Sequence, residues 1–379
     1  MHDLIEPGWT LTHRAVNGLD LVVVEAGPAD GAPVILLHGF PEFWWGWRRQ
    51  IAALAQAGYR VIAPNLRGYA GSAAPKPVAS YHLDILAADV LGLAKACGVS
   101  RFDLVAHDWG AVIAWRVLNL YPDLVARAVL MDGPHPDQLA AYAAAHPRQA
   151  ARSAYVAMFQ PPVLPELALR AFGYAALKAS LRGSARPGTF SDRDLATYEW
   201  TWAQPGALSA MLNYYRALRL RRAQARPPAI TTPVLVLWGQ GDAFLEPGLA
   251  RAALSLCQAG RLIVVPQAGH WLHLEQPAAV NAAILEFLGE GAETSGNGPG
   301  PPALVGEEAD MSIKQQADQE IEASRDGDAD LAFLLPEDQW DAFLSQTGAI
   351  SQGDPPEATY RGVRFKRAPV TAIIHEEGF

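Results

Sequence analysis

The stretch Val105-Ala106-His107-Asp108-Trp109-Gly110 decides the fold of this chain. It directly follows a short apolar run typical of a buried strand and directly precedes a helical pattern. A nucleophile elbow requires small residues two positions before and two positions after its nucleophile, because the turn from strand to helix is tight and strained. Ala106 and Gly110 meet this requirement, so the pattern predicts an elbow with Asp108 as its nucleophile.

The aspartate at this turn has a second interpretation, as the residue that caps the N-terminus of the following helix. As a nucleophile, a carboxylate attacks an electrophilic carbon and forms an ester, which divides one difficult reaction into two easier ones. The elbow alone leaves both interpretations open, because short motifs of this kind also arise by chance.

Two later strand ends favour the catalytic interpretation. Asp242 follows the apolar run Leu235-Val236-Leu237-Trp238, and His270 follows a run that ends at Val265. The order nucleophile, acid and histidine, each just past a strand, is that of α/β hydrolases. A turn would explain either later residue singly, but together with Asp108 they predict a catalytic triad.

Two neighbouring residues leave alternatives to this triad. Asp132 follows a strand that ends at Met131 and competes with Asp242 for the role of the acid, although Asp242 is the preferred partner. His273 forms an i, i+3 pair with His270 that a metal could use. Because no third ligand stands nearby in the sequence, a surface-loop histidine is the preferred interpretation of His273.

The run His38-Gly39-Phe40-Pro41 follows another strand, where the oxyanion-hole loop of this fold lies. A plain tight turn is the simpler explanation of its glycine and proline. Its place beside the elbow favours the functional one, in which the backbone N–H groups of Phe40 and Trp109 face the oxygen of a tetrahedral intermediate.

The rest of the body alternates strands with helices. Its strands are apolar throughout, which predicts a mostly parallel sheet covered by helices. The alternation stops over about residues 136–228, where a helical pattern rich in Ala, Leu and aromatic residues predicts a cap inserted between two strands. Residues 1–293 are therefore expected to form one α/β domain with a helical cap. Its strands are predicted at 19–25, 33–38, 59–63, 102–106, 128–131, 233–238 and 262–265.

The composition changes after residue 293. Residues 294–310 are rich in Gly and Pro, which predicts a flexible linker, and 311–379 form an acidic extension that is either a small module or disordered. Residues 294–379 hold 16 acidic and 6 basic side chains, so the net charge of −9 belongs to this part and the body is near neutral. A near-neutral body without a basic stripe argues against nucleic acid as a partner.

Four acids of the extension have the spacing of a calcium loop: Asp326, Asp328, Asp330 and Glu337. Leu331 replaces the glycine that the sharp turn of such a loop requires. An acidic, solvated linker is therefore the preferred interpretation.

The composition of the 379 residues, half apolar and 18% charged, is that of a soluble globular protein. No apolar run approaches the ~20 residues that a membrane span needs, and the N-terminus lacks the features of a secretory signal. Cys97 and Cys257 alone provide neither a disulfide framework nor a Cys-ligated zinc site. We therefore expect a cytoplasmic protein without a membrane partner.

Several longer runs carry a family resemblance. They are His38-Gly-Phe-Pro-Glu-Phe-Trp-Trp-Gly-Trp-Arg-Arg-Gln50, Leu66-Arg-Gly-Tyr-Ala-Gly-Ser72 and His107-Asp-Trp-Gly110, with Gly133-Pro-His-Pro136, Tyr155-Val-Ala-Met-Phe-Gln-Pro161, Gln204-Pro-Gly-Ala-Leu-Ser209 and Asn213-Tyr-Tyr-Arg216 in the insertion. These runs resemble the epoxide hydrolases of the α/β-hydrolase fold, in the branch of the animal soluble enzyme and its membrane-anchored relatives. The resemblance covers about residues 1–293 and none of the extension. Asp132 departs from the Asn often found at its position, which keeps the assignment of the acid open.

In that family two cap tyrosines hold the epoxide oxygen, and the resemblance places them at Tyr155 and Tyr215. Ring opening produces an alkoxide, so it needs a hydrogen-bond or proton donor, and a phenol with a pKa near 10 can donate at neutral pH. The residues alone do not select these two from the other tyrosines of the insertion, which are Tyr142, Tyr174, Tyr198 and Tyr214.

The resemblance implies an epoxide hydrolase that forms an alkyl ester on Asp108 and hydrolyses it with water activated by His270 and Asp242. Its expected partners are a small hydrophobic epoxide, bound by Tyr155, Tyr215 and Trp109, and water, with no metal or organic cofactor, in a monomer or homodimer. A haloalkane or haloacid dehalogenase uses the same nucleophile, but Phe40 stands where many haloalkane dehalogenases carry Asn. A ligand-binding α/β hydrolase without turnover is a further alternative.

Overall fold

The computed structural model describes residues 2–220 and 229–290 and the shorter segments 331–336, 344–347, 349, 357–360, 363–368 and 373–375. Its contacts divide the chain into two compact units, Met1–Pro301 and Pro302–Phe379. The predicted linker 294–310 and the four possible calcium ligands lie outside the described residues.

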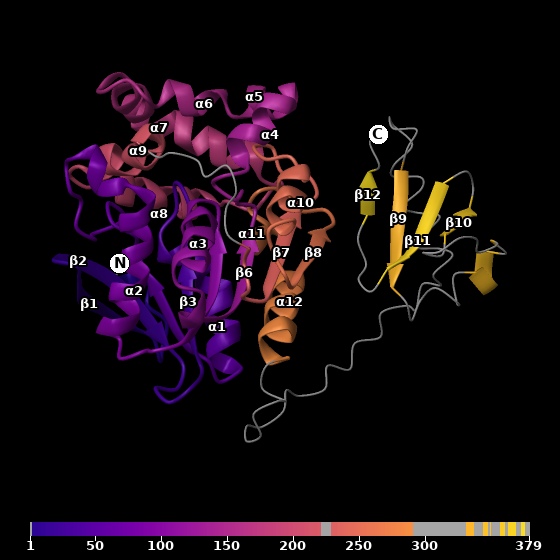
Figure 1. Cartoon of the computed structure of the whole chain (residues 1–379). Coiled ribbons are helices and arrows are strands. Elements are labelled where there is room, and N and C mark those ends of the chain that lie inside the picture. The colour runs from indigo at the N-terminus through magenta and orange to yellow at the C-terminus, as the bar shows by residue number, and fades with distance from the viewer. Residues whose placement is uncertain are drawn as a thin grey trace. The chain divides into compact units, whose positions relative to one another are not determined.

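The larger unit is built on an eight-stranded sheet with the order β1-β2-β4-β3-β5-β6-β7-β8 (Figure 1). The pairs β1–β2 and β2–β4 are antiparallel, and every pair from β4 to β8 is parallel. The predicted mostly parallel sheet is therefore confirmed. The strands are β1 (Thr10–Val16), β2 (Leu19–Ala26), β3 (Pro33–Leu37), β4 (Arg60–Pro64), β5 (Phe102–His107), β6 (Val125–Met131), β7 (Val234–Gly239) and β8 (Gly260–Val265).

The edge strand β1 is the one strand of the larger unit that the sequence pattern did not reveal. It pairs with β2 from Thr10 opposite Glu25 to Val16 opposite Leu19, and of its residues only Val16 is buried. All six residues of the central strand β7 are buried. A strand buried on both faces reads as a continuous apolar run, whereas a partly exposed edge strand does not, which explains why β1 was missed.

Helices flank the sheet and pack against one another in pairs, α2 against α3 and α1 against α12. The helices of this part are α1 (Arg48–Gln56), α2 (Leu83–Ala96), α3 (Trp109–Leu120), α10 (Gly248–Leu254), α11 (Leu272–Glu275) and α12 (Pro277–Gly289). Among the described residues, no helix has the length and apolar character needed to cross a lipid bilayer.

The helical insertion lies between β6 and β7, and in Figure 1 its helices gather over one end of the strands. It comprises α4 (Leu139–Ala145), α5 (Pro147–Arg152), α6 (Ala154–Met158), α7 (Leu164–Ser184), α8 (Asp192–Trp202) and α9 (Ala207–Ala217). A capping box fixes the start of α8, because the Ser191 hydroxyl accepts from the Asp194 N–H while the Asp194 carboxylate accepts from the Ser191 N–H. We call this insertion the cap.

The smaller unit contains a four-stranded sheet with the order β10-β11-β9-β12. The central strands β9 (Leu331–Pro336) and β11 (Val363–Ala368) are parallel. The outer strands, β10 (Glu357–Tyr360) and β12 (Ile373–His375), are antiparallel to their neighbours. A sheet of more than two strands is the minimum that a small module needs for stability of its own.

Candidate active site

Asp108 occupies the turn between β5 and α3 with a φ of 50° and a ψ of −119°. A positive φ is strained for a residue with a side chain, so the surroundings must enforce it. Gly110 permits the turn, because a Cβ there would lie 2.1 Å from the carbonyl oxygen of Leu37. A Cβ on Gly39 would likewise come within 2.4 Å of the Asp108 side chain. The two glycines thus let the strand end, the helix and the oxyanion loop close around Asp108.

The Asp108 carboxylate is held by the loop that follows β3. Its Oδ1 accepts the backbone N–H of Phe40 at 2.7 Å. Its side chain makes no capping hydrogen bond to the described residues of α3, which separates it from the helix-cap interpretation. The Trp109 amide, expected as a second donor, stays a prediction.

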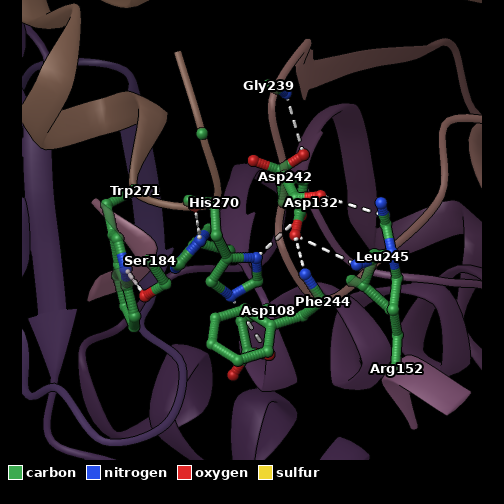
Figure 2. Close-up of polar contacts among 12 residues, drawn as sticks. Asp108, Asp132, Arg152, Ser184, Gly239, Asp242, Phe244, Leu245, His270 and Trp271 are labelled. Carbon is green, nitrogen blue, oxygen red and sulfur yellow. Dashed lines mark hydrogen bonds and ion pairs between the residues drawn. The ribbon is translucent and has the colours of Figure 1, made fainter. Parts of the chain in front are cut away.

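The His270 imidazole lies between two carboxylates. Its Nδ1 donates to Asp242 Oδ2 at 2.8 Å, and its Nε2 lies 3.7 Å from Asp108 Oδ2. The other Asp242 oxygen, Oδ1, accepts the backbone N–H groups of Phe244 at 2.7 Å and Leu245 at 3.0 Å (Figure 2). These bonds fix the Asp242 carboxylate, which in turn orients the imidazole so that Nε2 faces Asp108.

Charge controls the protonation of this imidazole. Burial alone would lower the pKa of His270, but the Asp242 and Asp108 carboxylates raise that pKa well above its ordinary value. The two carboxylates therefore favour the protonated, imidazolium form of His270.

Asp132, the rival acid, lies beside this pair without taking the contact. Its Oδ1 accepts the Gly239 N–H at 2.9 Å, while its Oδ2 has no hydrogen-bond partner among the described residues. Burial, together with the charge of Asp242, raises the pKa of Asp132 well above its ordinary value. Asp242 thus makes the direct bond to His270, and Asp132 stays a buried acid whose protonated form is favoured.

A cavity of about 380 Å³ lies between Asp108 and the cap. Asp108, Tyr155, Tyr215 and His270 all line it. Most of the remaining wall is apolar and includes Phe40, Trp109, Val112, Leu139, Val156, Phe159, Leu169, Leu177, Leu181, Leu218, Phe244 and Trp271, with Arg152, Ser153 and Ser180 as polar members.

The two predicted tyrosines come together in this cavity from different cap helices. Tyr155 lies on α6 and Tyr215 on α9, with ring centroids 5.8 Å apart, and the Tyr215 ring also packs edge-on against Trp109 at 5.1 Å. Burial and then the nearby charges, Asp108 among them, raise the pKa of both phenols. Both hydroxyls therefore stay protonated and can donate.

The other cap tyrosines do not line the cavity. The Tyr214 hydroxyl donates to the Arg67 carbonyl at 2.9 Å, and that of Tyr198 donates to Glu42 Oε1 at 2.7 Å. Tyr174 and Tyr142 are also engaged elsewhere, the first with the Trp202 carbonyl and the second stacked on His146. The packing of the cap thus separates the two tyrosines from the four that the residues alone left equivalent.

A second buried cluster lies behind the triad. The prediction of His273 as a surface-loop residue is wrong, because α11 turns its ring inward against Trp47 and leaves it fully buried. Its Nε2 lies 3.2 Å from Glu42 Oε2, and His107 Nδ1 lies 3.6 Å from the same oxygen. Glu42 and His107 were missed by the sequence reasoning. The available signal was a lone acid inside the aromatic run that follows Pro41.

Glu42, His107 and His273 offer three potential ligand atoms within 4.8 Å of one another. Two neighbouring atoms of the cluster are already engaged, since Glu42 Oε1 accepts from Tyr198 and His107 Nε2 donates to the His270 carbonyl at 2.7 Å. We interpret the cluster as a buried polar network in which Glu42 faces the two histidine rings.

Comparison with known proteins agrees with this geometry. The profile of the family described as alpha/beta hydrolase fold matches residues 32–277. The chain is 37% identical over 280 residues to epoxide hydrolase 4 of Mus musculus, with 72% of this chain and 77% of that protein covered. It is 34% identical over 317 residues to epoxide hydrolase A of Mycobacterium tuberculosis, with 73% and 97% covered. The chain belongs to the epoxide hydrolase family of α/β hydrolases.

Two further proteins extend the family likeness. The AB hydrolase superfamily protein YfhM of Bacillus subtilis is 42% identical over 272 residues, with 72% of this chain and 95% of that protein covered. The crystal structure of an epoxide hydrolase of Bacillus megaterium in complex with an inhibitor matches with a TM-score of 0.68 at 28% identity, covering 73% of this chain and 99% of that one.

Proposed function

We propose that this protein hydrolyses an epoxide to a vicinal diol through a covalent ester on Asp108. The observation that carries the proposal is the carboxylate at the elbow, which shares an apolar cavity with two protonated phenols. An epoxide needs both groups, because its carbon must be attacked while its oxygen receives a proton. The epoxide hydrolases among the relatives support the same assignment.

In the first step Asp108 attacks one epoxide carbon with Oδ2, the carboxylate oxygen nearer to His270. A C–O bond of the ring breaks as the ester bond forms, and the leaving oxygen takes a proton from Tyr155 or Tyr215. The Phe40 amide holds Oδ1 throughout, which orients Oδ2 for the attack.

In the second step His270 removes a proton from water, which attacks the Asp108 carboxyl carbon. The negative charge then develops on Oδ1, already bonded to the Phe40 N–H. Collapse of this intermediate breaks the bond to the substrate oxygen, which takes the proton held by His270, and the diol is released. The proton left on the Asp108 carboxyl returns to the phenolate formed in the first step, which restores both the carboxylate and the phenol. Asp242 stabilises the imidazolium that forms.

Ester formation itself prepares the base for this step. The Asp108 charge is one of the groups that raise the pKa of His270 in the resting protein. Once Asp108 is an ester, that charge is gone and the pKa of His270 falls. A lower pKa favours the neutral imidazole, which is the form that can remove a proton from water.

The dehalogenase alternative has one observation in its favour, because Trp109 lines the cavity and an indole N–H is a type of donor that can bind a halide. The experiment incubates the protein separately with styrene oxide and with 1-bromobutane and then measures diol and bromide. We expect rapid diol formation and little bromide. Bromide in excess of diol would favour a dehalogenase, and neither product from folded protein would favour a ligand-binding protein without turnover.

A further inference from the structure

The buried Glu42 carboxylate contacts three separate segments of the site: cap helix α8, the end of β5 and helix α11. Its Oε1 accepts the hydroxyl of Tyr198, on cap helix α8, at 2.7 Å. Its Oε2 faces His107, the residue before the nucleophile, at 3.6 Å, and His273, on α11, at 3.2 Å. Glu42 and both histidines are at most 1% exposed, so no solvent screens these contacts.

The His107 ring connects this carboxylate to the main chain of the base. Its Nε2 donates to the His270 carbonyl oxygen at 2.7 Å, so that nitrogen carries a hydrogen and the other ring nitrogen, Nδ1, faces Glu42. The His107 ring also packs against the His270 ring with centroids 4.8 Å apart. Asp242 fixes the His270 side chain, whereas His107 fixes its backbone.

The same loop is tied to the cap at a second point. The Trp202 indole N–H, on α8, donates to the Pro41 carbonyl at 2.7 Å, one residue before Glu42. Helix α8 therefore holds the Pro41–Glu42 segment through two buried hydrogen bonds from its last turns. A shift of α8 would move Glu42, and with it the ring that anchors His270.

Burying an ionised carboxylate in a protein core costs free energy. Burial alone would raise the pKa of Glu42, and the facing His273 and His107 rings hold it well below its ordinary value. Ionised acids of this kind often add no net stability compared with apolar residues of the same volume. The arrangement is better explained by the orientation that a charged carboxylate gives to the Tyr198 hydroxyl, which donates to it, and to the His107 and His273 rings, which face it.

We infer that Glu42 is a positioning residue for the hydrolysis step, which it serves by holding His107 against the His270 backbone and by coupling that contact to the cap through Tyr198. The inference rests on the proposed two-step function. A positioning role of this kind should affect the two steps differently. Formation of the ester uses Asp108 and the cavity tyrosines, whereas hydrolysis of the ester requires His270 to be oriented toward a water molecule.

The test is a rapid-quench experiment with styrene oxide, in which mass spectrometry follows the amount of alkylated protein over time. It yields separate rates for ester formation and ester hydrolysis. In Glu42→Gln we expect hydrolysis to slow by about 10²-fold, the scale of a small misplacement of a reacting group. Formation should change by less than about threefold, so the alkylated protein accumulates.

Tyr198→Phe removes a single hydrogen bond from the same carboxylate and serves as the milder variant. It should slow hydrolysis by a smaller factor, again without slowing formation. The matched control is Asp89→Asn, which breaks another buried ion pair, from Arg67 Nε to Asp89 Oδ2 at 2.5 Å. This control should lower the melting temperature and leave the ratio of the two rates unchanged.

The outcomes are distinguishable. Equal slowing of both steps in Glu42→Gln and Tyr198→Phe, or no change in either, would overturn the positioning role. If Glu42→Gln does not fold, Tyr198→Phe decides by the same ratio. If the unmodified protein turns over styrene oxide without ever carrying an adduct, the proposed function itself fails and the inference falls with it.

Discussion

The strand ends and the cap contribute to one site but hold their residues by different means. At the strand ends, backbone amides fix the charged groups, with Phe40 bonded to Asp108 and both Phe244 and Leu245 bonded to Asp242. In the cap, aromatic packing places the phenols, with the Tyr155 and Tyr215 rings edge to face at 5.8 Å. Hydrogen bonds from the backbone orient a single carboxylate, so its loss cannot be compensated. Ring packing shapes the cavity wall around two phenols, so one phenol remains when the other is removed.

This contrast predicts all-or-none losses at the strand ends and graded losses in the cap. The largest effect should follow Asp108→Ala, which removes the atom that forms the ester. We expect no detectable diol and a melting temperature at or above that of the unmodified protein, since the substitution removes a charge and keeps the backbone. Chromatography of the product and a thermal melt measure both. Turnover close to that of the unmodified protein would contradict the role of Asp108 as the nucleophile.

The cap should respond in proportion to the number of phenols removed. Tyr155→Phe and Tyr215→Phe should each be partial, and the double variant should lose about 10²–10⁴-fold in epoxide turnover, the usual contribution of general-acid catalysis. A halide leaving group needs no proton, so any side activity on 1-bromobutane should fall much less. A ratio of the two activities that stays constant would mean that these tyrosines only pack.

The two acids near His270 follow neighbouring strands but should differ in their effect on ester hydrolysis. Asp242→Asn removes the charge bonded to Nδ1 and should slow ester hydrolysis by about 10²-fold. Asp132 bonds the Gly239 N–H and not the imidazole, so Asp132→Asn should change the same rate by less than about threefold. The rate of adduct decay measures both. Equal losses would show that the two acids share the role.

The smallest effect is on stability. Burial lowers the pKa of His273 to about 4, below its unfolded value of about 6.5. The unfolded state therefore binds the extra proton first, so this contribution to stability is present above pH 6.5 and is lost as the pH falls toward 4. Gln does not titrate in this range, so the His273→Gln variant does not lose stability in this way. From pH 7 to pH 5 its free energy of unfolding should therefore rise relative to that of the unmodified protein, by up to about 1.4 kcal/mol per pH unit. Denaturant titrations at the two pH values test this, and a difference independent of pH would contradict it.

The fold was predictable because the elbow and the buried parallel strands have strong local signatures. The edge strand Thr10–Val16 was not, because its partly exposed residues do not form an apolar run. The choice between Asp242 and Asp132 was left open for a different reason. Both follow neighbouring strands of the sheet, β7 and β6, and only the contact with the imidazole separates them.

The cap and the buried network were the parts that local sequence could not determine. Which tyrosines face the cavity depends on how the cap helices pack on the sheet, so Tyr155 and Tyr215 were selected by family resemblance alone. His273 was misplaced because a short helical turn carries it inward to Glu42, a residue more than two hundred positions earlier in the chain. Contacts between such distant segments leave no periodic trace in the sequence.

The central claim is that turnover proceeds through an ester on Asp108 that only His270 can release, and one measurement tests it most directly. The variant His270→Gln is incubated with styrene oxide, and intact and peptide mass spectrometry then locate any added mass. We expect one epoxide equivalent per chain, on the peptide that contains Asp108, persisting while almost no diol appears. Continued diol formation without an adduct, or an adduct on any other residue, would contradict it.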